Sequence, residues 1–277
     1  GKTNLVGLLG QPVDHSLSPI MHNAAYEEMG LDWCYVAIPC DRENVEKITT
    51  ALRVVDCKGL NVTIPHKQEV LKACNKLTET ANKIQAVNTL VPEKNNQWIG
   101  ANTDVEGFLM PLKNHHLINK SVIVIGCGGS ARAVIMGLNS LNIRKITIIG
   151  RNKNSLNIFI SSMKNLLSKN QISIEGIDNK ELDITSYIEE ADLIINTTPI
   201  GMNDQSNVKN NIPLGNEIWN CLSNKTILYD LIYTPRPTNW LKLGQEKNCC
   251  VIDGLDMLIG QGALSIKLWS GFNEVPV

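Results

Sequence analysis

The chain has 277 residues, of which 43% are hydrophobic and 19% charged, and its formal net charge at pH 7 is −1. Such a composition supplies a buried core for one large or two smaller domains and excludes a mainly disordered chain. The balance of acidic and basic residues gives no support for binding to nucleic acid or to a membrane surface. The apolar runs are short, so we expect neither a membrane span nor a signal peptide.

Eight cysteines are spread along the chain without a C-x-x-C pair or the spacing of a zinc site. Most of them stand in apolar segments, where cysteine behaves as a small hydrophobic residue. We therefore expect reduced thiols in a cytoplasmic protein, and no bound metal.

Short apolar strands alternate with helical segments, in two series. The first series predicts strands over residues 4–10, 33–39, 59–64, 86–91 and 97–102. Its first helix has Ser18 as the predicted N-cap, Pro19 at the first helical position and Gly30 past the end. The second series predicts strands at 121–129, 145–150, 192–198, 226–232 and 249–254. Strands separated by helices indicate an α/β fold with parallel sheets.

The two series predict two α/β domains with a cleft between them. A helix from about residue 103 to 114 would connect them, and a last helix over 255–269 would return to the first domain, since no strand follows it. The prediction is a mostly parallel sheet domain over 1–102 and 255–277, and a dinucleotide-binding domain over 103–254. Clefts between domains are favoured ligand sites. The Asn-rich stretch 202–211 predicts a surface loop.

A glycine-rich turn follows the strand that begins the second series. The strand runs into Gly126, Cys127, Gly128, Gly129, Ser130 and Ala131, and a helical pattern follows at once. This G-x-G-x-x-A spacing lets the backbone approach a pyrophosphate, and the helix N-terminus offers unpaired N–H groups to the anion. The strand–turn–helix context favours dinucleotide binding over a merely structural turn.

The residue after the next strand distinguishes NADP from NAD. NAD-binding units usually place an acidic residue there for the ribose 2′-hydroxyl, whereas this chain has Gly150, Arg151 and Asn152. A guanidinium suits a 2′-phosphate through its charge and its bidentate geometry. The sequence therefore favours NADP, with a solvated Arg151 as the alternative.

Several polar residues of the first domain stand at predicted strand ends: Ser16, Ser18, Thr63, Lys67, Asn88 and Asp104. In one parallel sheet these ends would share an edge, where open α/β sheets bind ligands. Each residue also has a structural explanation, with Ser18 or Asp104 as a helix cap and Lys67 as a solvated charge. His15 and His66 lie beside the same segments and rank below Lys67 as candidate catalysts.

Seven stretches resemble those of shikimate dehydrogenase in the same order and over nearly the whole chain: GQPVDHSLSPIMHN, NVTIPHK, AVNT, GANTD, GCGGSARAV, DLIYTPRPT and DGLDMLIGQGALSIKLW. The family commonly has Asn-Arg-Thr where this chain has Gly150, Arg151 and Asn152.

The resemblance implies roles for individual residues. Ser16, Ser18 and Tyr233 would bind the substrate carboxylate, and the ring hydroxyls and carbonyl would be held by Thr63, Lys67, Asn88, Asp104 and Gln261. The cofactor would contact the glycine-rich turn, Arg151, Asn152, Thr197 and Pro199, with Gly254 and Met257 beside the nicotinamide. The chemistry of a ketone reduction adds a hypothesis, because an ammonium can give a proton to the developing oxyanion. We expect Lys67 to be the proton donor and acceptor, with Asp104 orienting both Lys67 and a ring hydroxyl.

The resemblance implies a reversible reduction of 3-dehydroshikimate to shikimate with NADPH, a step of chorismate and aromatic amino acid biosynthesis. We expect a metal-free monomer or homodimer that binds this small-molecule substrate. The closest alternative is a quinate/shikimate dehydrogenase that accepts either acid and uses NAD or NADP. Further alternatives are a non-catalytic regulator that binds NADP or shikimate, and a different Rossmann reductase.

Overall fold

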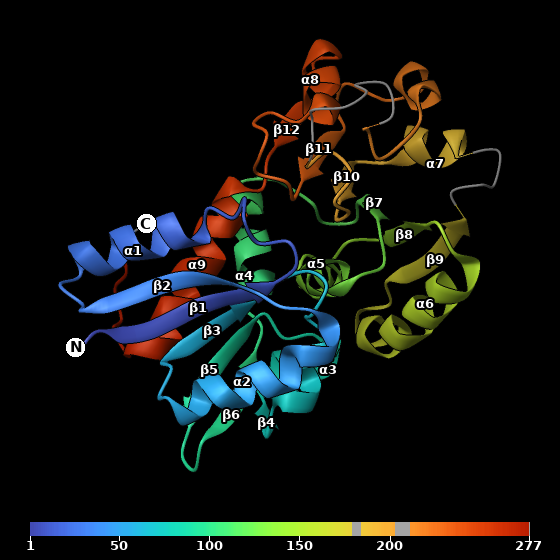
Figure 1. Ribbon diagram of the computed structural model, residues 1–277. Helices are drawn as coiled ribbons and strands as arrows, with labels where there is room; N and C mark the ends of the chain where they lie inside the picture. Colours follow the sequence, from blue (N-terminus) through green and yellow to red (C-terminus); the bar gives the residue numbers. More distant parts are fainter. Residues whose placement is uncertain (179–183, 203–210, 277) are drawn as a thin grey trace. The chain divides into compact units, whose positions relative to one another are not determined.

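A computed structural model describes residues 1–178, 184–202 and 211–276 (Figure 1). The chain forms two compact units, one of Gly1–Phe108 with Leu258–Val277 and one of Leu109–Met257. The predicted boundaries fell after residues 102 and 254. The predicted loop over 202–211 lies almost entirely outside the described residues.

The first unit holds a sheet with the strand order β2-β1-β3-β5-β6-β4. Its strands are β1 (Asn4–Gly10), β2 (Trp33–Pro39), β3 (Gly59–Val62), β4 (Lys76–Leu77), β5 (Thr89–Glu93) and β6 (Gln97–Ala101). Its helices are α1 (Ser18–Glu28), η1 (Arg42–Asn44), α2 (Val45–Val54), η2 (Glu69–Ala73), α3 (Glu79–Ile84), α4 (Asp104–Leu109) and most of α9 (Leu255–Ser270).

Both faces of this sheet are covered by helices (Figure 1). Successive side chains of a strand point to opposite faces, so the neighbours Leu8 and Leu9 of β1 enter different cores. Leu8 packs with Tyr26 of α1 and Ile266 of α9. Leu9 packs in the other cluster, with Val45 of α2. This double burial explains the nearly continuous apolar run of β1.

The sheet of the first unit is mostly parallel, as predicted, but one of its strands runs in the opposite direction. The pairs β1–β2, β1–β3 and β4–β6 are parallel, but β5 pairs antiparallel with both β3 and β6. A short hairpin joins β5 to β6, with Asn95 and Asn96 at φ of 57° and 55°. Asparagine enters this left-handed region more easily than most residues, which allows the tight reversal.

The two predicted helix boundaries in this unit need correction. Leu17, not Ser18, is the N-cap of α1, and Ser18 is the first helical residue. The backbone N–H of Ser18 instead donates to the hydroxyl of Ser16 at 3.2 Å. The connecting helix predicted to about residue 114 ends sooner, since α4 gives way to the 3₁₀ turn η3 (Met110–Leu112), which contains a proline near its start.

The second unit holds an all-parallel sheet with the order β12-β11-β10-β7-β8-β9. Its strands are β7 (Ser121–Ile125), β8 (Lys145–Gly150), β9 (Ser173–Asp178), β10 (Leu193–Asn196), β11 (Ile227–Asp230) and β12 (Cys250–Ile252). The helices are α5 (Gly129–Asn139), α6 (Lys153–Leu167), η4 (Ser168–Asn170), α7 (Thr185–Glu190), η6 (Asn216–Asn220) and α8 (Asn239–Glu246).

The order of this sheet is that of a doubly wound dinucleotide-binding fold. Strand β7 is central, and the chain proceeds outward first to β8 and β9 and then to β10, β11 and β12. The direction of winding reverses between β7 and β10, and ligands bind at the carboxyl ends of the strands at such a point. Strand β9 was not predicted, because its SIEGID sequence forms a partly exposed edge with weak apolar patterning.

Within the described ranges, no helix has the length and apolar character needed to cross a membrane.

Candidate active site

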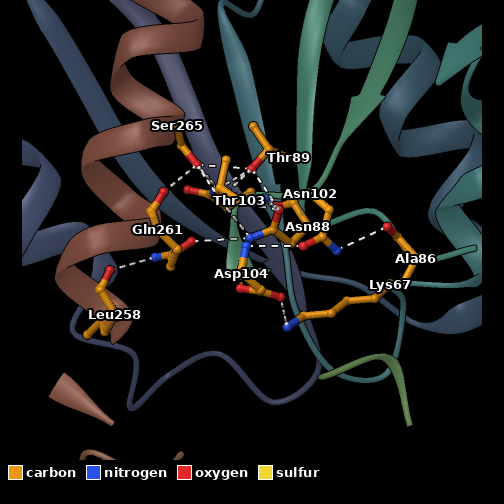
Figure 2. A network of polar contacts seen from close by, with 11 residues as sticks. Lys67, Ala86, Asn88, Thr89, Asn102, Thr103, Asp104, Leu258, Gln261 and Ser265 are labelled. Atoms are coloured by element: carbon orange, nitrogen blue, oxygen red, sulfur yellow. Dashed lines mark hydrogen bonds and ion pairs between the residues drawn. The ribbon is translucent and has the colours of Figure 1, made fainter. Parts of the chain in front are cut away.

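Lys67 and Asp104 form a nearly buried ion pair, although 37 residues separate them. The Lys67 Nζ atom lies 2.6 Å from Asp104 Oδ2, and the two side chains are 11% and 6% exposed (Figure 2). The backbone carbonyl of Lys67 accepts a hydrogen bond from Val87 N at 2.7 Å, which holds this residue beside the sheet. Lys67 is therefore an ordered, largely desolvated cation rather than a solvated surface charge.

Asn88 holds the other oxygen of Asp104. Its Nδ2 donates to Asp104 Oδ1 and to Thr103 Oγ1, both at 2.9 Å, while its Oδ1 accepts from Thr103 N at 2.8 Å. Gln261 Oε1 lies 3.4 Å from the same Nδ2 (Figure 2). Both carboxylate oxygens of Asp104 are thus engaged, which fixes the direction in which the carboxylate faces Lys67.

A second set of buried polar side chains adjoins Asn88, whose Oδ1 accepts from Thr89 Oγ1 at 3.0 Å. Asn61 Nδ2 donates to Ser265 Oγ at 2.9 Å, and Thr89 Oγ1 lies 2.9 Å from the same Ser265 atom. Tyr35 donates its hydroxyl to Asn61 Oδ1 at 2.8 Å. None of Asn61, Thr89, Ser265 and Tyr35 was predicted from the sequence as a site residue. An asparagine inside the apolar strand β3 was the available signal, since a buried amide needs hydrogen-bond partners.

Ser16 and Ser18 stand together at the start of α1, after the end of β1. The Ser18 carbonyl lies 2.8 Å from Nδ1 of His22, one helical turn later. His22 is fully buried, and its ring stacks on Tyr35 with the ring centroids 4.1 Å apart. The buried ring of His22 therefore holds the first turn of α1, at Ser18.

Thr63 lies beside the end of β1, where a Cβ on Gly10 would come within 2.3 Å of its γ-methyl group.

The titration of His22 should be visible in the stability of the protein. Burial lowers its pKa to about 4, although the hydrogen bond with Ser18 acts in the opposite direction. The unfolded chain takes up this proton near pH 6.5, so the stability from neutral His22 is complete above that pH and is lost as pH falls toward 4. We expect this group to remove about 3 kcal/mol of unfolding free energy between pH 7 and pH 4.

Urea denaturation of the wild type and of His22→Phe across this pH range measures that loss. The variant should lack this part of the pH dependence, whatever its stability at neutral pH. If the unfolding free energy of the two proteins falls equally between pH 7 and pH 4, the assignment to His22 is contradicted.

His66 and His15, the two histidines considered as alternative catalysts, lie apart from the polar contacts of Lys67. His66 is fully buried, and its Nε2 lies 2.6 Å from the backbone carbonyl of Cys40, so its ring faces the interior of the first unit. His15 is exposed. Neither one shares the polar network of Figure 2, which supports the ranking of Lys67 above histidine.

The glycine-rich turn lies between β7 and α5 in the second unit. Gly126 has a φ of +106°, and a Cβ there would lie 2.6 Å from Thr197 Oγ1. Nothing lies within 4 Å of a Cβ built on Gly128, so the backbone is open at this point. Helix α5 begins at Gly129 and continues through Ser130. Open backbone at the start of a helix fits the pyrophosphate of a dinucleotide.

Four further residues predicted to bind the cofactor lie in α5 or just after strands β8 and β10 of the second unit. Ala131 is fully buried, which suits the close helix–strand packing required of the last small residue in the motif. Arg151 is exposed just after β8, and Asn152 is the N-cap of α6, with its Oδ1 accepting from Ser155 N at 2.9 Å. Thr197 donates its hydroxyl to the carbonyl of Ile125 at 2.7 Å. An exposed guanidinium at this strand end fits a 2′-phosphate.

The last predicted residues belong to the loops after β10, β11 and β12. Pro199 is exposed and Tyr233 is half-buried. Met257 is buried at the start of α9. Gly254 N donates to Ile232 O at 3.1 Å. A Cβ on Gly254 would lie only 2.0 Å from Leu231 O, so this close approach requires glycine.

Comparison with known proteins identifies the family. Residues 8–90 match the model of the shikimate dehydrogenase substrate binding domain. A shikimate dehydrogenase (NADP(+)) of Prochlorococcus marinus (strain MIT 9515) is 51% identical over 274 residues, covering 99% of this chain and 94% of the relative. The chain belongs to the shikimate dehydrogenase family. The family predicted from the seven sequence stretches is therefore confirmed.

Solved structures of the shikimate dehydrogenase family share the fold. A crystal structure of shikimate dehydrogenase in complex with NADP+ has a TM-score of 0.86 and 35% identity, covering 99% of this chain and 92% of that chain. A quinate dehydrogenase from Corynebacterium glutamicum in complex with NAD has a TM-score of 0.85 and 27% identity, covering 99% and 95%. The predicted α/β fold class is confirmed.

Proposed function

We propose that this chain catalyses the reversible reduction of 3-dehydroshikimate to shikimate with NADPH. The oxidoreductase class and the NADP cofactor predicted from the sequence are confirmed by the curated relatives. The observation that carries the assignment of roles is the nearly buried pair of Lys67 and Asp104, next to the amides of Asn88 and Gln261.

The roles proposed for the residues follow from their chemistry. NADPH supplies the hydride when it is bound. Lys67 donates a proton from Nζ to the oxygen of the substrate carbonyl, and in the reverse direction it accepts the proton of the hydroxyl. Its positive charge also stabilises the oxyanion that develops before the proton moves. Asp104 keeps Nζ in position and accepts a hydrogen bond from a ring hydroxyl.

The remaining proposed contacts are made to the substrate and the cofactor. The hydroxyls of Ser16 and Ser18 hold the substrate carboxylate, with Tyr233 assisting, and Thr63, Asn88 and Gln261 hold ring oxygens. The cofactor is held by the glycine-rich turn, Arg151, Asn152, Thr197, Pro199, Gly254 and Met257.

The direct test is the reduction of NADP⁺ followed at saturating shikimate. We expect turnover with shikimate and NADP⁺, and much slower turnover when NAD⁺ replaces NADP⁺. Absence of NADP⁺ reduction with shikimate by the folded protein would refute the proposed function.

Quinate is the second candidate substrate, because the structure of a quinate dehydrogenase covers 99% of this chain with a TM-score of 0.85. Quinate carries one more hydroxyl, at the carbon that bears the carboxylate. The same assay with quinate, using each cofactor in turn, decides between a strict shikimate dehydrogenase and one that accepts both acids. A cytoplasmic location and a monomeric or dimeric state stay predictions.

Replacing Arg151 with alanine should weaken NADP⁺ binding selectively. A hydrogen-bonded charge pair contributes about 1.5–3 kcal/mol, so we expect the KM for NADP⁺ to rise roughly 10-fold to 100-fold. The KM for NAD⁺ should barely change, because NAD⁺ lacks the 2′-phosphate. Lys164→Ala, an exposed change of equal charge on α6, is the control. Equal effects on both cofactors would remove Arg151 from this role.

Removing the hydroxyl of Ser16 or Ser18 should weaken substrate binding alone. Each serine donates to a carboxylate, and losing one such bond should raise the KM for shikimate roughly 10-fold. The KM for NADP⁺ should stay unchanged. Ser270→Ala, at the far end of α9, is the control in the same unit, since its hydroxyl bonds Ile266 O and Phe272 N beside the C-terminal end of that helix. Wild-type KM values in both variants would leave the serines as turn residues.

A further inference from the structure

Asp230 is a buried carboxylate that the proposed chemistry does not use. It is the last residue of β11, and it pairs in register with Asn196, the last residue of β10. Both side chains are completely buried. Burial raises the pKa of Asp230 to about 6, against the opposing effect of its hydrogen bonds. A carboxylate in such a place is costly unless donors surround it.

Three donors from different places in the chain converge on Asp230. Its Oδ1 accepts from Asn196 Nδ2 at 3.0 Å and from Ile232 N at 3.2 Å. Its Oδ2 accepts from Thr238 Oγ1 at 2.8 Å. We call these four residues the Asp230 cluster. Every contact is a donor facing an oxygen, which is the arrangement that suits an ionised carboxylate.

On one side the Asp230 cluster closes the loop after β10. Asn196 Oδ1 accepts from both Thr198 N, at 3.0 Å, and Thr198 Oγ1, at 2.7 Å. The second hydrogen of its Nδ2 reaches Ile200 O at 3.1 Å. The side chain of Asn196 therefore folds residues 197–200 into one turn, and the bond to Asp230 fixes the orientation of that amide.

On the other side the Asp230 cluster spans the loop after β11. Ile232 and Thr238, near the two ends of this loop, are both held by the same carboxylate. Thr238 also caps α8, accepting from Leu241 N at 3.3 Å, and Ile232 O accepts from Gly254 N at 3.1 Å. The loops that follow three neighbouring strands, β10, β11 and β12, are thus tied to one buried group (Figure 1).

These loops carry residues that the proposed function assigns to ligands: Thr197, Pro199, Tyr233 and Gly254. We propose that Asp230 is a positioning residue, whose buried carboxylate holds loop 197–200 and, through loop 231–238, Gly254 in the arrangement that binds the dinucleotide. The proposal rests on the proposed function for the identity of the cofactor. It requires no contact between Asp230 and the ligand, because the carboxylate acts through Asn196, Ile232 and Thr238.

The test compares direct NADPH binding, followed by the fluorescence of NADPH itself, in four variants. Asp230→Ala should raise the Kd for NADPH at least 10-fold. Thr238→Val removes one donor at nearly constant volume and should raise it at least 3-fold. Thr238→Ser keeps the hydroxyl and should bind as the wild type does. Thermal unfolding of each variant is measured beside its Kd.

Thr226→Val is the matched control. Thr226 is buried just before β11, at the opposite end of the same strand, and donates to Ala191 O at 2.8 Å. Its loss should lower Tm yet leave the Kd for NADPH within 2-fold of the wild type. If Asp230→Ala fails to fold, the Thr238 pair carries the comparison.

The proposal is overturned if Asp230→Ala and Thr238→Val change the Kd no more than Thr226→Val does, or if Thr238→Ser binds as weakly as Thr238→Val. Failure of the proposed function has a different signature. In that case the wild type binds NADPH but does not oxidise shikimate when NADP⁺ is supplied, and the ratios of Kd among the variants still measure the role of Asp230.

Discussion

Replacing Lys67 with alanine should lower kcat by roughly 10²-fold to 10⁴-fold, the range that a positioned proton donor contributes. The KM for shikimate should stay near the wild-type value, because the carboxylate and most ring oxygens keep their partners. A fall in kcat and in kcat/KM by the same factor is the signature of an interaction made in the transition state alone. Steady-state assays with shikimate and NADP⁺ measure both constants.

Lys72→Ala is the matched control for this substitution. Lys72 lies five residues further along the same segment, and its side chain is 71% exposed beside Glu69. Its removal should leave kcat unchanged. Lys67→His should recover part of the rate with an altered pH profile, since imidazole is also a proton donor and acceptor near neutral pH. Near wild-type turnover by Lys67→Ala would show that another group moves the proton.

Replacing Asp104 with asparagine should lower both the activity and the stability of the protein. The change keeps the shape of the side chain and removes the charge that faces Lys67 Nζ at 2.6 Å. Breaking a buried pair leaves one charge uncompensated, and we expect a loss of about 3 kcal/mol, at the low end of the range because Lys67 keeps some exposure. The kcat should fall as well, because Nζ is no longer held toward the substrate.

Chemical denaturation and steady-state assays of Asp104→Asn measure the two effects. Glu79→Gln provides the comparison on the surface, since Glu79 pairs with Lys83 at 2.6 Å but is 80% exposed. The unfolding free energy of that variant should be close to that of the wild type, because exposed ion pairs contribute little to stability. If Asp104→Asn proves as stable and as active as Glu79→Gln, the buried pair neither stabilises the fold nor positions Lys67.

Local patterns were enough to predict most of the strands and the glycine-rich turn. Strands β1, β2 and β8 begin and end where the apolar runs predicted, because each run has clear polar or turn residues at its limits. The turn at Gly126 was readable for the same reason, since its backbone conformation depends on residues next to one another in the chain. The family was also readable, because its seven stretches are short and contiguous.

Features that depend on distant residues were not readable. The ion pair joins the segment after β3 to the start of α4, and Ser265 on α9 bonds both Asn61 and Thr89. Strand β5 runs antiparallel to β3 and β6. Ser18 resembled an N-cap until the helix was seen to begin one residue earlier. Asp230 occupied an ordinary strand end in the sequence, and its donors come from a neighbouring strand and from the loop that leads to α8.

The physical reason lies in the range of the interactions. Backbone preferences and apolar periodicity act over a few residues, so a single sequence displays them directly. Burial of a charge, and the partners that make it tolerable, depend on which segments the folded chain brings together. The sequence therefore named Lys67 and Asp104 as candidates, whereas their 2.6 Å contact and their near-complete burial come from the packing of elements far apart in the chain.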